Sequence, residues 1–124
     1  MSQDIVADAL NEIMNIKKAK KLELSIKRYS EFLLNLFGLL KKLNYLDYKI
    51  ENKELRVKIK ETLNECKAIK PRFNVSIEEI EKYIRRFLPS RDFGFLIIST
   101  NKGLMTHQEA LEKNIGGSLI AYVY

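Results

Sequence analysis

The stretch "STNKGLMTHQEALEKNIGGSLIAYVY" (Ser99–Tyr124) carries the clearest order in the sequence. A polar segment with one glycine leads into a helix signal, a glycine pair and an apolar strand pattern. Thr106 and Glu109 have the spacing of a capping box, and Gly116 stands where a left-handed residue ends a helix. "SLIAYVY" predicts a final strand because it is rich in apolar and β-branched or aromatic residues. The sequence therefore predicts that strands hold a polar loop and a glycine turn side by side.

The residues just before this stretch predict a helix and another strand. Ser76 and Glu79 form a second capping box, and apolar residues at helical spacing follow until Pro89. "FGFLIIST" is short, apolar and typical of a buried strand. "NECKAIKPRFNV" breaks these patterns, so we expect it to connect two lobes. Residues 66–124 are predicted to form a mixed α+β lobe that ends in a strand.

Residues 1–65 predict a helix-strand-helix-strand-strand layer. Helical spacing runs from Asp4 to about Ile16, and strand-like alternation follows from Leu22 to Ile26. Ser30 is a suitable N-cap for a second helix. Two alternating segments around "ENKE" predict a hairpin whose outer face carries three basic residues, Arg56, Lys58 and Lys60. The predicted fold class is α+β, in two small lobes.

Charge and length limit the classes of partner. The chain has 124 residues, 46% of them hydrophobic, and a formal net charge of +6. A basic protein attracts polyanions, so nucleic acid is the leading partner and an anionic membrane surface the second. No apolar run approaches the roughly 20 residues of a spanning helix, and the first residues lack a signal-peptide pattern. We expect an intracellular protein without a membrane partner.

The sequence offers little for catalysis. His107 is the only histidine and Cys66 the only cysteine. We expect His107 to be an exposed residue of a capping box and Cys66 to be a buried or idle thiol. The glycine spacing of a phosphate-binding loop is absent. The sequence therefore predicts a protein that is not an enzyme and that has no metal, cofactor or small-molecule substrate.

Two polar segments are candidates for contact with RNA. Ser99–Gly103 combines hydroxyl, amide and ammonium groups with a flexible glycine, which suits base edges, sugars and phosphates. The same residues are also ordinary turn formers. "KKAKK" (Lys17–Lys21) adds positive charge at the end of the first predicted helix. It is either a solvated helix end or a phosphate contact through Lys20 and Lys21.

Several motifs together resemble one known family. "IISTNKGLMTHQEALEKNIGGSLIAYVY" is similar to the C-terminal signature of the small-subunit ribosomal protein family numbered eight, in which S-T-[ST]-[KR]-G is followed by M-T-x-x-E-A and by G-G before a last strand. "KPRFNV", "IEKYIRRFLPSRDFG" and "DIVADALNEI" extend the similarity over essentially the whole chain. "RRFLPSRDFG" resembles the archaeal and eukaryotic branch of the family.

The resemblance implies a structural constituent of the small ribosomal subunit. It implies a primary rRNA-binding protein that docks on a stem in the central domain of small-subunit rRNA and nucleates assembly. It also implies a cytoplasmic location and neighbouring small-subunit ribosomal proteins as partners. Two alternatives stay open: a small RNA-binding protein outside the ribosome, and a protein-interaction module that uses the edge of the C-terminal sheet. Nonspecific DNA binding is less well supported, since no helix presents a dense basic face.

The resemblance also implies which residues contact RNA. Asn101 replaces the usual hydroxyl residue of the loop, and Ser118 stands where many bacterial members have an acidic residue, so no acidic contact is carried over. The residues carried over from the family, with the weaker pair Pro71 and Arg72 at the end, are Ser99, Thr100, Asn101, Lys102, Gly103, Gly116, Gly117, Pro71 and Arg72.

Overall fold

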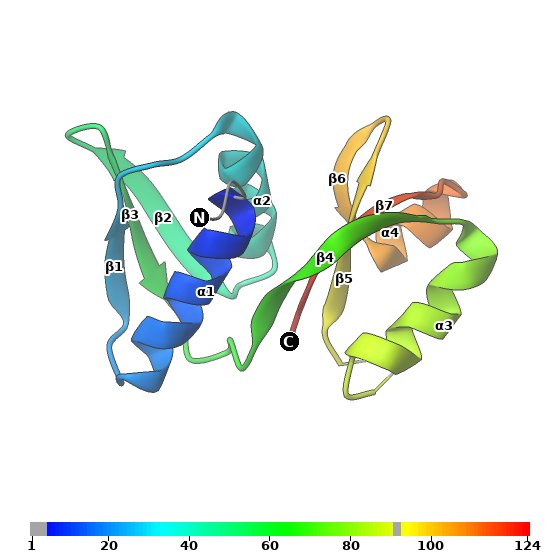
Figure 1. Ribbon diagram of the computed structural model, residues 1–124, viewed down its shortest axis with the longest axis horizontal. Helices are drawn as coiled ribbons and strands as arrows, with labels where there is room; N and C mark the ends of the chain where they lie inside the picture. The colour runs from blue at the N-terminus through cyan, green and yellow to red at the C-terminus, as the bar shows by residue number, and fades with distance from the viewer. Residues whose placement is uncertain (1–4, 91–92) are drawn as a thin grey trace. The chain divides into compact units, whose positions relative to one another are not determined.

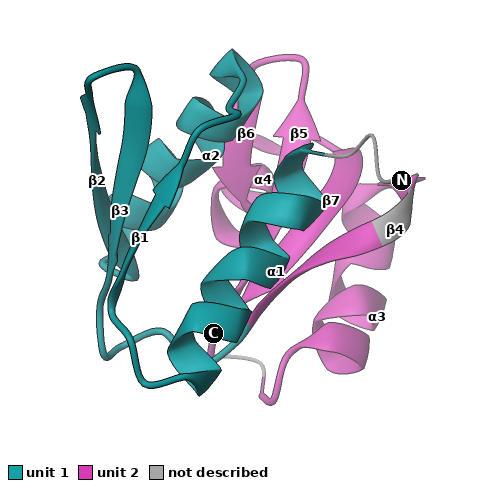
Figure 2. Ribbon diagram, turned by 60° about the vertical axis from the view of Figure 1, so that its left-hand side comes forward, with its two compact units in different colours: residues 1–65 teal, residues 66–124 magenta. Residues whose placement is uncertain are grey.

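The computed structural model describes residues 5–90 and 93–124, apart from the side chains of residues 70 and 71. Asp4, the predicted start of the first helix, lies outside the described residues. The chain divides into two compact units, unit 1 (residues 1–65) and unit 2 (residues 66–124), which Figure 2 shows in different colours. Each unit combines helices with a sheet of its own, and the predicted α+β class is confirmed.

From residue 5 onward, where the structure describes it, unit 1 is a three-stranded antiparallel sheet with two helices (Figure 1). The strand order is β1-β3-β2, with α1 next to β1 and α2 next to β2. In chain order the elements are α1 (Ile5–Lys18), β1 (Glu23–Ile26), α2 (Glu31–Lys42), β2 (Leu46–Glu51) and β3 (Glu54–Ile59). The predicted order of helix, strand, helix and hairpin is confirmed.

Local residue chemistry explains where these elements begin and turn. Ser30 starts α2, and its Oγ accepts a hydrogen bond from the Leu33 N–H at 3.2 Å. Asn52 and Lys53 both have left-handed backbone conformations, with φ of 51° and 62°. Two consecutive positive φ values are what a type I′ hairpin turn requires, and its twist matches that of the strands. This turn therefore fixes the register of β2 on β3.

Apolar periodicity determines which face of each element in unit 1 is buried. In β3, Leu55, Val57 and Ile59 are buried, whereas Arg56 and Lys58 between them are exposed, as the alternation predicted. Each fully buried aliphatic side chain contributes about 1.5–3 kcal/mol to folding. The buried apolar residues of α1, α2 and the sheet are Val6, Ala7, Ala9, Leu10, Ile13, Ile26, Leu33, Leu36, Phe37, Leu40, Leu46, Leu55, Val57 and Ile59.

In its described residues, unit 2 is a four-stranded antiparallel sheet with two helices. The strand order is β4-β7-β5-β6, so the last strand of the chain lies in the middle of the sheet. In chain order the elements are β4 (Cys66–Val75), α3 (Ile77–Phe87), β5 (Phe95–Thr100), β6 (Gly103–Thr106), α4 (His107–Lys113) and β7 (Gly117–Val123). The core includes Val75, Ile80, Ile84, Leu96, Ile98, Met105 and Leu119.

The start of unit 2 differs from the sequence-based expectation. "NECKAIKPRFNV" was expected to be a connection, but most of it is the strand β4. The pairing of β4 with β7 shifts register between Ala68 and Phe73, and Pro71 falls inside this interval. A proline has no N–H for the ladder, so an irregular interval is where a strand tolerates it. This irregularity interrupts the alternation from which a strand would have been predicted.

Candidate nucleic-acid interface

Ser99–Gly103 forms the tip of a hairpin and not a loop that leads directly into a helix. Thr100 pairs with Gly103 at the end of the β5–β6 ladder, and Asn101 and Lys102 form the turn (Figure 1). Both turn residues are exposed. Gly103 has a φ of 111°, a conformation that residues with a side chain rarely adopt. The short strand β6, which the sequence did not predict, therefore presents an amide and an ammonium group at an exposed tip.

The hydroxyl of Thr100 stabilises this turn. Its Oγ1 donates a hydrogen bond to the Gly103 carbonyl oxygen at 2.9 Å. The same oxygen accepts a hydrogen bond from the Lys102 N–H at 3.1 Å. The Ser99 side chain, in contrast, makes no hydrogen bond with the residues that the structure describes, and it is partly exposed. The two neighbouring hydroxyls thus differ in how much hydrogen-bonding capacity they retain.

The glycine pair lets two segments of backbone approach closely. A Cβ atom on Gly116 would lie 2.6 Å from the Val75 carbonyl oxygen. A Cβ atom on Gly117 would overlap the Ser99 carbonyl oxygen and lie 2.9 Å from Ile98 Cγ2. Gly117 therefore lies directly beside the end of β5, so the structure brings the hairpin and the glycine pair together.

Gly116 is not the residue that ends α4. Asn114 takes the left-handed conformation at the C-cap, with φ 58° and ψ 45°, so the predicted role of Gly116 as the left-handed cap is wrong. Asparagine tolerates this conformation better than most residues do because its short polar side chain bonds locally. Gly116 is instead required by the close approach of Val75.

The remaining predicted contact residues lie outside this cluster. Arg72 is exposed in β4, and Pro71 belongs to the same strand, although its side chain lies outside the described residues. Lys20 and Lys21 follow α1 in unit 1, where both are exposed. Lys20 has a φ of 62°, and the Lys21 N–H donates to the Ile16 carbonyl oxygen at 3.0 Å. These lysines thus cap the end of α1 with positive charge.

Two polar residues near the hairpin were not assigned by sequence. Ser118 is the cross-strand partner of Ser99, and Asn74 is the partner of Ser118 on its other side. Asn74 is exposed and Ser118 is partly exposed. The alternation in "RFNV" was the available signal, because it sets Asn74 on the face opposite Phe73 and Val75.

His107 is buried, and the expectation that it is exposed is wrong. Its side chain is 2% exposed, and its Nδ1 accepts a hydrogen bond from the Leu96 N–H at 3.1 Å. Burial lowers the pKa of His107, and the opposing charge of Glu81 raises it by less. An Nδ1 that accepts a hydrogen bond carries no proton, so this histidine is neutral. It is a structural residue of unit 2.

The two predicted capping boxes are found to different extents. Glu79 Oε1 accepts hydrogen bonds from the Ser76 N–H and Oγ, each at 3.1 Å, and these bonds lower the pKa of Glu79. At α4, Thr106 Oγ1 accepts from the Glu109 N–H at 3.3 Å. Cys66 is buried, as expected.

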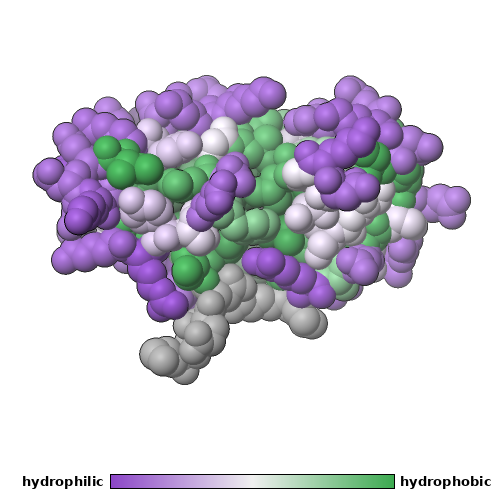
Figure 3. Space-filling view, turned by 90° about the horizontal axis from the view of Figure 1, so that it is seen from above, coloured by the Kyte–Doolittle hydropathy of each residue, from purple (hydrophilic) through white to green (hydrophobic). Residues whose placement is uncertain are grey.

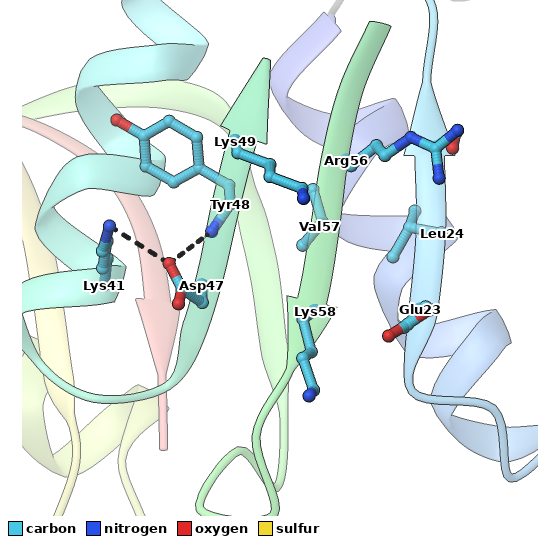
Figure 4. Close-up of a pocket in the computed structure, with 10 residues that line it drawn as sticks. Glu23, Leu24, Lys41, Asp47, Tyr48, Lys49, Arg56, Val57 and Lys58 are labelled. Atoms are coloured by element: carbon cyan, nitrogen blue, oxygen red, sulfur yellow. Dashed lines mark hydrogen bonds and ion pairs between the residues drawn. The ribbon is translucent and has the colours of Figure 1, made fainter. Parts of the chain in front are cut away.

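A groove of about 850 Å³ lies over the solvent face of the sheet in unit 1 (Figure 4). Lys41 forms an ion pair with Asp47 at 3.1 Å, and the Tyr48 N–H donates to the same carboxylate at 2.8 Å. Both hydrogen bonds lower the pKa of Asp47, that from Lys41 by more than that from Tyr48. Arg56 forms an ion pair with Glu51, with its Nε 3.3 Å from Glu51 Oε2. Carboxylates therefore offset much of the positive charge here, which makes this groove a weaker anion site than its lysines suggest.

The described part of the chain contains no helix with the length and apolar character needed to span a membrane. In the face drawn in Figure 3, hydrophilic residues occupy a large part of the surface.

Comparison with known proteins identifies the family. The family model for ribosomal protein S8 matches residues 4–124. Small ribosomal subunit protein uS8 of Nanoarchaeum equitans is 41% identical, with both chains covered completely. The protein of the same name from Archaeoglobus fulgidus is 38% identical, again over both whole chains. That of Eremothecium gossypii is 34% identical over 97% of this chain and 96% of the relative. The resemblance seen in the sequence is thereby confirmed, and the chain belongs to the ribosomal protein S8 family.

Proposed function

We propose that the chain is a structural, non-enzymatic component of the small ribosomal subunit in the cytoplasm, where it binds a stem in the central domain of the small-subunit rRNA and nucleates assembly. The observation that carries the proposal is the family match over residues 4–124. The net charge of +6 agrees with a polyanionic partner. Other small-subunit proteins are the expected neighbours.

The geometry of unit 2 supports different roles for the individual contact residues. The exposed turn of Asn101 and Lys102 offers an amide for base edges or sugars and an ammonium for a phosphate. Gly103 leaves room for an RNA backbone to approach, because a Cβ atom there would meet nothing within 4 Å. Gly116 and Gly117 act indirectly, because they let the backbone approach Val75 and Ser99 closely. Ser99 adds a hydroxyl without an internal hydrogen bond among the described residues.

The basic residues supply positive charge for phosphates and do not distinguish one RNA sequence from another. Arg72 in unit 2, together with Lys20 and Lys21 in unit 1, is exposed and suited to phosphate contacts. Pro71 would contribute by shaping β4 next to Arg72. Such contacts fix the position of a protein on RNA but do not distinguish one stem from another.

A gel-shift titration with two RNAs tests the proposal. The first is the central-domain stem of small-subunit rRNA, and the second is an unrelated duplex of the same length and base composition, both at one fixed salt concentration. We expect the stem to bind at least about 1,000-fold more tightly, the lower end of the range by which specific binding exceeds nonspecific binding. Equal binding of both RNAs would contradict the proposal and favour an RNA-binding or protein-interaction role outside the ribosome.

A further inference from the structure

Aromatic side chains form a continuous series of ring contacts in unit 2. The rings of Tyr83 and Phe87 in α3 have centroids 6.4 Å apart and planes 17° from parallel. Phe87 stacks in turn on Tyr122 of β7 at 5.6 Å, and Tyr122 stacks on Tyr124 at 6.1 Å. Phe93 ends the series, edge-on to Tyr124 at 6.0 Å. Aromatic pairs prefer such arrangements, so these rings hold one another in place.

Four of these rings form a partly exposed surface, the aromatic patch (Phe87, Phe93, Tyr122 and Tyr124). Phe93 is 45% exposed, and the other three rings are partly exposed. Phe87 is the last residue of α3, and Tyr122 lies near the end of β7. The patch therefore lies at the end of the sheet opposite to the β5–β6 hairpin (Figure 1).

The backbone next to the patch is shaped to accommodate Tyr124. Gly94 has a φ of 99°, which favours glycine. A Cβ atom on Gly94 would lie 2.7 Å from Tyr124 Cβ and 2.8 Å from the Val123 carbonyl oxygen. The position of Tyr124 is thus fixed by the backbone as well as by its ring contacts. A surface that is already ordered loses little conformational entropy when a partner binds.

Two cations lie at the rim of the patch. Lys67 is directly opposite Tyr122 in the ladder between β4 and β7, so the two side chains share one face of the sheet. The guanidinium carbon of Arg86 is 5.3 Å from the centroid of the Phe87 ring. Both cations are exposed, and neither forms an ion pair with a residue that the structure describes. The rim therefore offers positive charge to a partner.

The ring stacking indicates which class of partner this surface suits. Nucleic-acid bases stack on the free faces of aromatic rings. Phe87 lies between Tyr83 and Tyr122, and Tyr122 lies between Phe87 and Tyr124, so neighbouring rings cover the faces of both. Their edges remain for a partner, and the edge is the positive part of an aromatic ring. Positive edges and the two rim cations complement carboxylates that stand beside apolar side chains, a combination found in protein segments and not in an RNA backbone.

We propose that the aromatic patch, with Lys67 and Arg86, binds an acidic segment of another small-subunit protein, in which carboxylates stand beside aliphatic side chains. Aromatic residues and arginine are enriched at the centres of protein interfaces, where a few such residues contribute most of the binding energy. The inference goes beyond the proposed function, and only the source of the segment, another protein of the small subunit, rests on that function.

Photo-cross-linking in the assembled subunit tests the class of partner. Cells are made to produce the chain with p-benzoylphenylalanine in place of Phe93, and their small subunits are isolated and irradiated. We expect a cross-link to one protein, within a segment of net negative charge. The same amino acid in place of Tyr29, a partly exposed tyrosine of unit 1, is the control and should not label that segment. A cross-link to rRNA, a cross-link to a segment without net negative charge, or no cross-link would overturn the inference.

Charge reversal at the rim tests the role of the cations. Arg86→Glu, added to the photoreactive chain, should lower the cross-link yield by about 10-fold or more, because a like charge repels the carboxylates of the segment. Arg85→Glu is the matched control, since Arg85 is exposed in the same helix and the change in net charge is equal. Equal yields from the two variants would contradict the assignment. Melting temperatures check that both variants fold.

Affinity for the central-domain stem separates this surface from RNA binding. Both reversals remove the same charge, so they should weaken binding to the stem equally. A loss confined to Arg86→Glu would assign Arg86 to RNA and overturn the inference. If the chain sediments with the small subunit but gives no acidic protein cross-link, the inference fails and the proposed function stands. If the chain does not sediment with the small subunit, the proposed function fails, and the inferred partner fails with it.

Discussion

At the scale of single residues, the two neighbouring hydroxyls at the end of β5 have different roles. Thr100 makes two hydrogen bonds that close the Asn101–Lys102 turn, whereas Ser99 makes none with the described residues. A family motif treats the two as equivalent, because both are hydroxyl residues. The hydrogen bonds separate a residue that builds the hairpin from one that is available to a ligand.

This difference predicts unequal effects on stability. Thr100→Val keeps the branched shape but removes both hydrogen bonds, so it should lower the free energy of unfolding by about 0.5–1.5 kcal/mol. Ser99→Ala removes no internal hydrogen bond and should change it by less than about 0.5 kcal/mol. Urea denaturation of both variants measures the difference. Equal stabilities would show that the Thr100 hydrogen bonds contribute nothing in solution.

His107 predicts a pH dependence of stability. Burial lowers its pKa below the ordinary value of 6.5 in the folded chain, whereas the unfolded chain titrates near that value. The unfolded state therefore binds more protons in this range, and stability should fall as the pH drops from about 6.5 towards the folded pKa. No other side chain has an ordinary pKa near 6, because His107 is the only histidine.

The His107→Asn variant is the control for this effect. The asparagine Oδ1 can accept the hydrogen bond from the Leu96 N–H without titrating. Urea denaturation of both proteins between pH 8 and pH 5 should show a decline for the parent and a flatter profile for the variant. The same decline in both proteins would assign the pH dependence to other groups.

At the scale of elements, close backbone approach explains where glycine is needed. Gly117 faces the Ser99 carbonyl oxygen with no room for a Cβ atom. Gly38 lies within α2, where an added Cβ would be 3.6 Å from Tyr48 Oη, an ordinary contact distance. The same substitution should therefore act in opposite directions at the two positions.

Gly117→Ala should destabilise the protein by about 1–3 kcal/mol, because β5 and β7 must move apart to accommodate the methyl group. Gly38→Ala should stabilise it by up to about 1 kcal/mol, since alanine is the better helix former. Thermal melting of both variants checks the signs. A neutral Gly117→Ala would mean that the β5–β7 spacing is wider in solution.

How far the sequence predicts an element depends on whether one of its faces is buried. β3 alternates strictly between buried and exposed residues, so its periodicity predicted both the strand and its orientation. β6 has four residues and no such alternation, because its last two are both buried. The irregular pairing around Pro71 concealed β4 in the same way.

The residues of the candidate site also differ in how far the sequence predicts them. The hairpin tip and the glycine pair could be found from a motif that is continuous in sequence. The proximity of Asn74 to Ser99 could not be found in this way, because it follows from β7 pairing with both β4 and β5. The burial of His107 was missed for a related reason: its hydrogen-bond partner, Leu96, comes from a different strand.

At the scale of the whole molecule, positive charge predicts a salt-dependent affinity for RNA. Each lysine that contacts a phosphate releases counterions, so the logarithm of the affinity falls linearly with the logarithm of the salt concentration. Replacing both Lys20 and Lys21 by Ala should reduce this slope by about two units and weaken binding to the stem and to a random duplex equally. Titrations at several salt concentrations measure both effects.

A second double variant separates local contact from total charge. Replacing Lys42 and Lys53 by Ala removes the same charge from two other exposed positions of unit 1. If it lowers the slope as much as the Lys20 and Lys21 variant does, the effect is one of net charge, and the assignment of phosphate contacts to Lys20 and Lys21 is wrong.

Because Cys66 is buried, the reactivity of its thiol measures how often the structure around it opens. This only thiol of the chain lies at the first residue of β4, opposite Val123, and is 4% exposed. An alkylating reagent reaches the sulfur when the structure around the start of β4 opens. Where reclosing is faster than alkylation, the labelling rate divided by that of a free thiol equals the equilibrium constant for this opening. Mass spectrometry of the unmodified protein, with and without RNA, would thus report how much RNA binding reduces the opening of the sheet in unit 2.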